Sequence, residues 1–398
     1  MASAADIQAR FELDLAAGES VSPARIVVRQ GDGALRELVL DRTRLENVAG
    51  DGKVVVEQDR VRWTPPATGG TLRYGVPLSH RRKGTKAAGN DAFVGERFAI
   101  FRGDDAFPVR SWRRARGSTL EGELAVARPR NWALITPYRP DALGRLPIRN
   151  PGKRLARPIG WITAGDLGTR RDVISGIEIT VTAPRGLRME RVAMLALLRW
   201  TLPQLGPELV GEAGKSPGYG YINIVSAAEP MWLGALSAPN SLFVHADRPL
   251  ISENGTSTVV HEMVHVLLAD LATPRDQDWI DEGLAEYLSL RALRDSGTIS
   301  AIRYDATIAG FRRWGEQAKS LRGAASSGPV TARAVVVFHD LDAELRKATG
   351  GKQTVATLIR GFLAAGKTAS LASMRAAAGK FTGKPPRALA AAAVPGLD

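Results

Sequence analysis

The pattern of hydrophobic and polar positions changes character near residue 185. Before that point, hydrophobic residues alternate with polar ones in short runs, and turn signals such as Gly31-Asp32-Gly33 separate the runs. This period of two predicts β-strands with one buried face. The clearest alternations are Val61 and Trp63; Leu72, Tyr74 and Val76; and Ile177, Ile179 and Val181. Residues 102–170 are rich in Pro, Gly and Arg and predict long loops with short strands.

After Pro184 the hydrophobic spacing becomes helical. Residues 189–202 predict a helix with Val192, Leu195, Ala196 and Trp200 on one face. Two short strands follow, at 221–225 and 242–244, and then two helices, at about 257–271 and 279–294. Beyond Gly297 the chain predicts further Ala-rich helices and a Pro-containing tail, and no internal repeat is present. We expect an α+β fold in three parts, namely a β-rich domain at 1–184, a mixed domain at 185–297 and a helical region at 298–398.

Composition limits the classes of partner. The net charge is +13, which favours acidic partners. The densest basic stretch, from Arg81 to Arg154, lacks interleaved aromatic residues, so we interpret it as a solvated face and expect no nucleic-acid binding. The absence of cysteine excludes disulfides and thiolate metal sites, and no apolar run is long enough for a membrane span.

The first residues suggest a location for the protein. Small residues at 2–5 resemble the end of a cleaved signal peptide, so we expect an exported, periplasmic or secreted protein, with a cytoplasmic one as the alternative.

Two histidines stand four residues apart in the apolar run Thr258–Leu268, with Glu262 directly after the first. On a helix, His261 and His265 share one face, at the spacing that a single metal ion needs. Glu262 lies one residue round, near enough to act on a metal ligand without being one. H-E-x-x-H is the helix of zinc proteases, with two ligands and a general base. The stripe Val260, Val264, Leu267, Leu268 and Leu271 is expected to bury this helix, and Pro274 to end it.

A catalytic zinc site needs a third protein ligand. Leu268 and Leu271 stand where a metzincin has Gly and His, which excludes that class. The run Trp279–Leu290 offers Glu282 instead, with 16 residues between it and His265. Glu286 lies one turn further on and can accept a hydrogen bond from a ligand histidine. Asp276 or Asp278 can cap this helix, and Gly283 allows the close approach of another backbone.

Together the two motifs resemble the gluzincin metallopeptidases, specifically the aminopeptidase N and glycyl aminopeptidase group. The family motif W-L-N-E-G-F-A is matched by the residues from Trp279 to Ala285. The resemblance implies a thermolysin-like zinc peptidase domain after an N-terminal β-sandwich-like domain. It also implies one Zn²⁺ per chain on His261, His265 and Glu282, with Glu262 activating water.

Two positions depart from the family. The G-x-M-E-N segment, whose glutamate holds the substrate amine, corresponds to 234–240, which has no glutamate; Glu229 and Glu253 are the nearby acids. The family's oxyanion tyrosine corresponds to the stretch 331–334, which has no tyrosine. Tyr304 is our substitute. The other candidates for that role are Tyr219, Tyr221, His245 and His339.

We therefore expect a zinc metallopeptidase acting on peptides or proteins, and an endopeptidase in preference to a strict aminopeptidase. The alternatives are a zinc-binding but catalytically weak cell-envelope interaction protein, and a basic binding protein without enzymatic activity. The sequence leaves the oligomeric state open.

Overall fold

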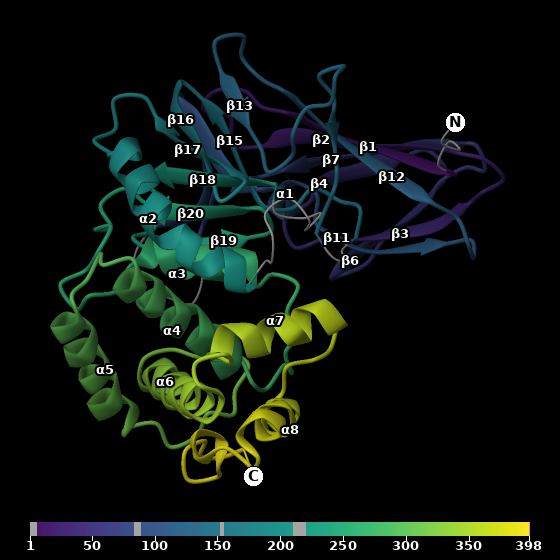
Figure 1. Cartoon of the computed structure of the whole chain (residues 1–398). Helices are drawn as coiled ribbons and strands as arrows, with labels where there is room; N and C mark the ends of the chain where they lie inside the picture. Colours follow the sequence, from purple (N-terminus) through teal and green to yellow (C-terminus); the bar gives the residue numbers. More distant parts are fainter. Residues whose placement is uncertain (1–5, 83–88, 152–154, 210–219, 398) are drawn as a thin grey trace. The chain divides into compact units, whose positions relative to one another are not determined.

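The computed structural model describes residues 6–82, 89–151, 155–209 and 220–397. Within them the chain forms 20 strands and eight α-helices (Figure 1). It divides into two compact units, each described separately here. The first takes in Met1–Arg171, Ile179–Arg191 and Tyr221–Arg248, and the second takes in Asp172–Glu178, Val192–Gly220 and Pro249–Asp398. The three-part division expected at 184 and 297 stays a prediction.

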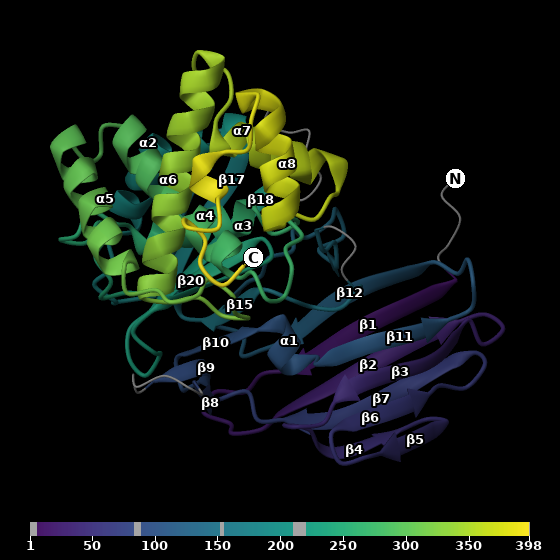
Figure 2. The same ribbon diagram turned by 90° about the horizontal axis from the view of Figure 1, so that it is seen from below.

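Two sheets of the first unit share one hydrophobic core (Figure 2). The six-stranded sheet contains, in spatial order, β14 (Leu146–Pro147), β12 (Leu120–Ala127), β1 (Ile7–Asp14), β2 (Ser22–Gln30), β7 (Gly69–Val76) and β4 (Glu46–Gly50). The four-stranded sheet contains β11 (Val109–Arg114), β3 (Leu35–Asp41), β6 (Arg60–Thr64) and β5 (Lys53–Val56). Alternate side chains of both sheets, such as Phe11, Ile26 and Trp63, are buried in the common core. This is the layering of a β-sandwich.

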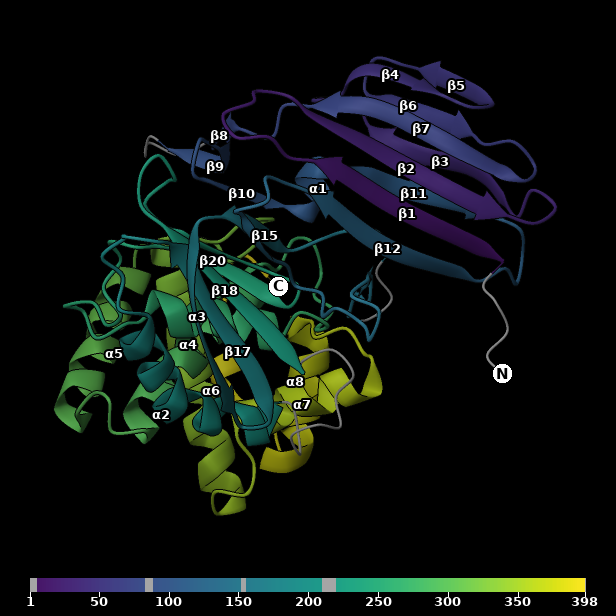
Figure 3. The same ribbon diagram turned by 90° about the horizontal axis from the view of Figure 1, so that it is seen from above.

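Two five-stranded sheets complete the strands (Figure 3). One contains β13 (Ala133–Ile135), β15 (Trp161–Gly165), β10 (Phe98–Arg102), β9 (Asn90–Val94) and β8 (His80–Arg81), with the short helix α1 (Gly103–Ala106) after β10. The other contains β16 (Leu167–Ile174), β17 (Ile177–Pro184), β18 (Tyr221–Ala227), β20 (Ser241–His245) and β19 (Ala235–Ala238). The strands predicted at 221–225 and 242–244 are confirmed as β18 and β20, which pair in parallel.

The second unit is helical. Its helices are α2 (Arg191–Leu209), α3 (Thr258–Leu267), α4 (Trp279–Asp295), α5 (Ala301–Gly315), α6 (Pro329–Thr349), α7 (Val355–Ala365), α8 (Leu371–Thr382) and the 3₁₀ turn Arg387–Leu389. The helical reading beyond Gly297 is therefore confirmed. None of the helices in the described residues has the length and apolarity needed to cross a bilayer.

Two details of the sequence reading are wrong. Of the predicted face of α2 only Leu195 is buried, whereas Val192 and Trp200 are 66% and 61% exposed and Ala196 is exposed too. Met194 and Leu198, outside that face, are buried, so the predicted face is not the packed one. Apolar residues surround most of this helix, and the spacing therefore did not single out one face. Residues 102–170 were predicted to hold only short strands, but they contain the eight-residue strand β12, which pairs in parallel with β1 over its whole length. A parallel pair is not joined by a hairpin turn, so the sequence around β12 carries no turn signal for it.

Candidate metal centre

Helix α3 presents both histidines on one face. Ser257 begins the helix, since its side chain accepts a hydrogen bond from the Val260 amide at 3.4 Å. The predicted apolar stripe is confirmed, because Val260 and Val264 are fully buried and Leu271 is 9% exposed. The helix nevertheless ends at Leu267, before the predicted end at 271 and well before Pro274.

Helix α4 is fixed against α6 at the level of the glutamates. Trp279 is fully buried and its ring stacks on Phe338 with centroids 5.6 Å apart. A Cβ on Gly283 would lie 2.6 Å from the Ala334 Cβ, so only glycine allows this close approach. The neighbour is thus a side chain of α6, whereas the sequence reading expected a backbone.

The predicted cap of α4 is wrong in its contacts. Asp278 stands at the N-cap position, but it makes no capping hydrogen bond and accepts one from the Ser326 amide at 2.6 Å. Asp276 forms an ion pair with Arg322 at 2.7 Å. Both aspartates therefore fasten the loop before α6 to the start of α4.

His261, His265 and Glu282 converge on one point. The Nε2 atoms of the two histidines lie 3.2 Å apart. Glu282 Oε2 lies 3.6 Å from His261 Nε2, and Glu282 Oε1 lies 3.4 Å from His265 Nε2. A tetrahedral zinc ion with bonds of about 2.0–2.1 Å holds its ligand atoms about 3.3–3.4 Å apart. The three separations bracket that value, so the donor set fits zinc both in chemistry and in spacing.

Glu286 fixes the orientation of His261. The Nδ1–H of His261 donates to Glu286 Oε2 at 2.7 Å, which directs Nε2 toward Glu282 and His265. Burial alone would lower the pKa of the His261 imidazole, but hydrogen bonds to Glu282 and Glu286 raise it to about 10. Burial would likewise raise the pKa of Glu282, yet its hydrogen bonds to both imidazoles hold that pKa far below 4.5. The cluster thus favours positive charge at its centre, which a divalent cation supplies.

Glu262 is 8% exposed and lies close enough to His261 for its charge to contribute to the raised pKa of that imidazole. It follows His261 on α3 and is not among the residues whose ligand atoms converge. A general-base role for Glu262 stays a prediction.

A cavity of about 720 Å³ adjoins the cluster, with Glu282 and Glu286 in its wall. The other lining residues come from the loop before α3, from α5 and from the start of α6: Glu253, Asn254, Thr256, Arg303, Ala306, Thr307, Gly310, Phe311, Arg313, Trp314, Ser326, Ser327, Gly328 and Thr331. Among these residues the sequence analysis had named only Glu253 as a possible site residue. The others follow no sequence motif, because residues on separate helices that line one cavity have no fixed spacing along the chain. Thr331 belongs to the segment where the family tyrosine was sought.

Tyr304 lies in a different environment. It is 5% exposed on α5, its ring centroid lies 6.2 Å from that of His339, and the Arg291 guanidinium lies 5.8 Å from its ring. Burial raises the pKa of its hydroxyl. Tyr304 and His339 are absent from the described residues that line the cavity. An oxyanion role for either stays a prediction without a supporting contact.

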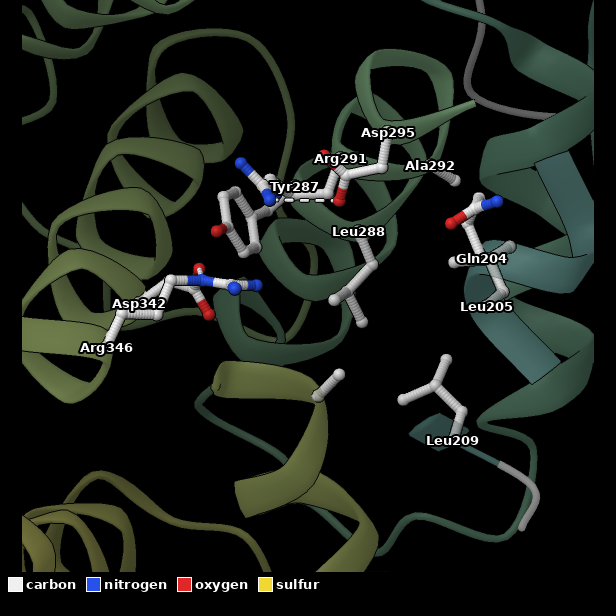
Figure 4. Close-up of a pocket in the computed structure, with 11 residues that line it drawn as sticks. Gln204, Leu205, Leu209, Tyr287, Leu288, Arg291, Ala292, Asp295, Asp342 and Arg346 are labelled. Atoms are coloured by element: carbon white, nitrogen blue, oxygen red, sulfur yellow. Dashed lines mark hydrogen bonds and ion pairs between the residues drawn. The ribbon is translucent and has the colours of Figure 1, made fainter. Parts of the chain in front are cut away.

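A second cavity, of about 50 Å³, lies beside Arg291 (Figure 4). Tyr287, Asp342 and Arg346 also line it. Asp342 accepts hydrogen bonds from Arg346 Nε at 2.5 Å and from the Val355 amide at 2.7 Å, which ties α6 to the start of α7. Arg291 forms an ion pair with Asp295 at 2.9 Å.

The remaining candidates belong to the first unit or lie outside the described residues. Tyr221 begins β18, and the Arg139 guanidinium lies 5.4 Å from its ring. His245 ends β20, is 3% exposed, and has a pKa lowered by burial. Glu229 and the segment 234–240 are in the same unit, and Tyr219 lies outside the described residues.

Comparison with known proteins gives a likeness of fold. No protein-family model and no curated protein matches the sequence. An aminopeptidase N family protein from Idiomarina loihiensis is similar in structure, with a TM-score of 0.65 and 14% identity over 90% of this chain and 70% of that one. An M1 zinc metallopeptidase from Deinococcus radiodurans has a TM-score of 0.63 and 15% identity over 98% of this chain and 94% of that one. A variant of it bound to a Tyr-Ser-Ala substrate has a TM-score of 0.66, 14% identity and the same coverage. The resemblance expected from the two motifs is confirmed as a shared α+β fold.

Proposed function

We propose that this chain is a zinc-dependent peptidase. The observation that carries the proposal is the convergence of His261, His265 and Glu282 at separations of 3.2–3.6 Å, with Glu262 beside them. The fold shared with zinc metallopeptidases supports it.

His261, His265 and Glu282 would hold the zinc, and Glu286 would keep His261 in its binding tautomer. Bound zinc would polarise the scissile carbonyl and lower the pKa of the water bound to it to about 7. The Glu262 carboxylate would accept a proton from the attacking water and donate it to the amide nitrogen that leaves.

The proposal is tested on the zinc-loaded chain with a mixed peptide library. We expect hydrolysis that stops on chelation and returns when zinc is added back. One bound zinc without turnover would favour the catalytically weak zinc-binding protein, for which the missing family tyrosine is the argument. Absence of zinc binding would favour the basic binding protein.

Cleavage within peptides remains our prediction from the lack of an acid in 234–240. One observation supports N-terminal cleavage as a second candidate, because Glu253 lines the same cavity as Glu282 and can pair with a free α-ammonium. The similar structures include an aminopeptidase N family protein, which supports the same candidate.

Matched peptides with free and acetylated N-termini separate these two modes. An endopeptidase cleaves both, whereas stepwise loss of single residues from the free peptide alone supports the aminopeptidase. In the second case Glu253→Gln should raise KM for the free peptide.

A further inference from the structure

We propose that the 720 Å³ cavity beside the metal cluster selects peptides that carry a carboxylate, and that Arg313 is the residue that determines this specificity. The inference rests on the proposed peptidase function and adds its substrate class. The carboxylate has two possible sources, an acidic side chain or the C-terminus of the peptide, and the test distinguishes them.

The charged side chains of the cavity wall differ in whether they have a partner of opposite charge. Glu282 and Glu286 are hydrogen-bonded to the histidines of the cluster. Arg303 donates to the carbonyl oxygens of Ser252 at 2.7 Å and Glu253 at 3.2 Å, which neutralise none of its charge. Arg313 is exposed and has no ion-pair partner in the part of the chain that the structure describes. Two arginines therefore line the cavity without an ion pair to the carboxylates of the cluster, and Glu253 is the one further carboxylate among the described lining residues.

Arg303 also holds its own wall in place. Through the two carbonyl contacts it fastens the loop before α3 to α5, and Thr307 adds a hydrogen bond to the Asn254 carbonyl at 2.8 Å. The Arg303 guanidinium is thereby fixed at the rim, which lowers the entropy cost of binding an anion. Because Arg303 has this structural task, Arg313 is the better residue to vary.

The start of α6 adds to the positive potential of this wall. Ser326 belongs to the lining residues, and its buried hydroxyl lies beside the Asp278 carboxylate, which also accepts a hydrogen bond from the Ser326 amide at 2.6 Å. Gly328 and Thr331 bring the N-terminus of this 21-residue helix to the same wall, and its dipole adds positive potential. A carboxylate placed here would gain this helix potential as well as two cations.

The wall of α5 between the arginines is apolar. Ala306, Gly310, Phe311 and Trp314 line it, and Trp314 is 46% exposed. Such a surface packs against methylene groups while the arginines bind the charged end. A glutamate side chain, or the last residue of a short peptide, has this combination.

The experiment starts from a neutral peptide that the wild-type enzyme cleaves. Glutamate, glutamine or lysine replaces one residue at a time around the scissile bond, and each peptide is made with a free and an amidated C-terminus. We expect kcat/KM to be roughly fivefold higher for one glutamate peptide than for its glutamine counterpart, or for the free C-terminus than for the amidated one. This ratio corresponds to the interaction energy of a partly exposed charge pair. In Arg313→Gln this ratio should fall to near one through a loss of kcat/KM on the preferred peptide. Arg313→Glu should turn the preference toward lysine.

Arg312→Gln is the matched control. Arg312 is the neighbouring arginine on α5, pairs with Asp340 at 2.8 Å and is not among the residues lining this cavity. It should keep the wild-type ratio. An unchanged ratio in Arg313→Gln, an equal loss in Arg312→Gln, or a wild-type enzyme that does not distinguish the peptides would each overturn the inference.

Binding gives a readout that does not depend on turnover. The affinity of the same peptides is measured by calorimetry for the inactive variant Glu262→Gln and for the double variant Glu262→Gln with Arg313→Gln. The double variant should bind the preferred peptide roughly fivefold more weakly than Glu262→Gln alone. If the wild-type enzyme cleaves no peptide, the proposed function fails, and calorimetry still decides whether the cavity prefers a carboxylate.

Discussion

Replacing Glu286 by alanine should weaken zinc binding without removing a ligand. The substitution deletes the carboxylate that accepts the His261 Nδ1–H at 2.7 Å, and so releases the ring from its binding tautomer. Losses of such supporting hydrogen bonds typically cost about 10–100-fold in metal affinity, or about 1.4–2.8 kcal/mol. Glu282→Ala removes one of three protein ligands and should cost considerably more.

Competitive titration with a zinc chelator measures both variants against the wild type. Glu253→Ala is the matched control, since it removes a carboxylate from the same cavity wall without touching the cluster. We expect zinc affinity in the order wild type and Glu253→Ala, then Glu286→Ala, then Glu282→Ala. Equal losses at Glu282 and Glu286, or a greater loss at Glu286, would refute the assignment of ligand and supporting residue.

Two further predictions concern stability. Asp105 has a 2% exposed side chain that pairs with Arg44 at 2.8 Å and Arg102 at 3.4 Å, so Asp105→Asn should lower the free energy of unfolding at pH 7 by about 3 kcal/mol in urea titrations. Burial opposes ionisation of Asp105, but these partners hold its pKa below 3.8. The contribution of Asp105 to the free energy of unfolding is therefore complete above pH 3.8 and is lost as the pH falls through the lowered pKa. If Asp105→Asn unfolded with the same pH dependence as the wild type, this assignment would be wrong. Gly283→Ala places a Cβ 2.6 Å from that of Ala334 and should cost about 1–3 kcal/mol by thermal unfolding, whereas Gly361→Ala, which meets open space on α7, should stabilise by up to about 1 kcal/mol. Equal effects at the two glycines would show that packing of α4 on α6 is not the cause.

The sequence could predict the grouping of His261, His265 and Glu282 because helical geometry ties part of it to residue spacing, while their role as metal ligands stays a prediction. Two histidines four apart must share a face of α3, and Glu282 and Glu286 must share a face of α4. The convergence of the two helices came from the resemblance to a family and not from either pattern alone.

Features that depend on tertiary contacts were not predictable in the same way. Asp278 had the residue type of a cap, but the loop before α6 competes for its carboxylate. The packed face of α2 was misassigned because the helix is apolar nearly all round. The cavity takes its walls from segments between residues 253 and 331, whose meeting no local pattern records.

The most direct test of the central claim is Glu262→Gln, which keeps the shape of the side chain and removes its basicity. Zinc content and peptide hydrolysis are measured on the same preparation. The proposed mechanism predicts one zinc per chain, as in the wild type, with hydrolysis lost. A variant that loses its zinc, or that keeps wild-type turnover, would contradict it.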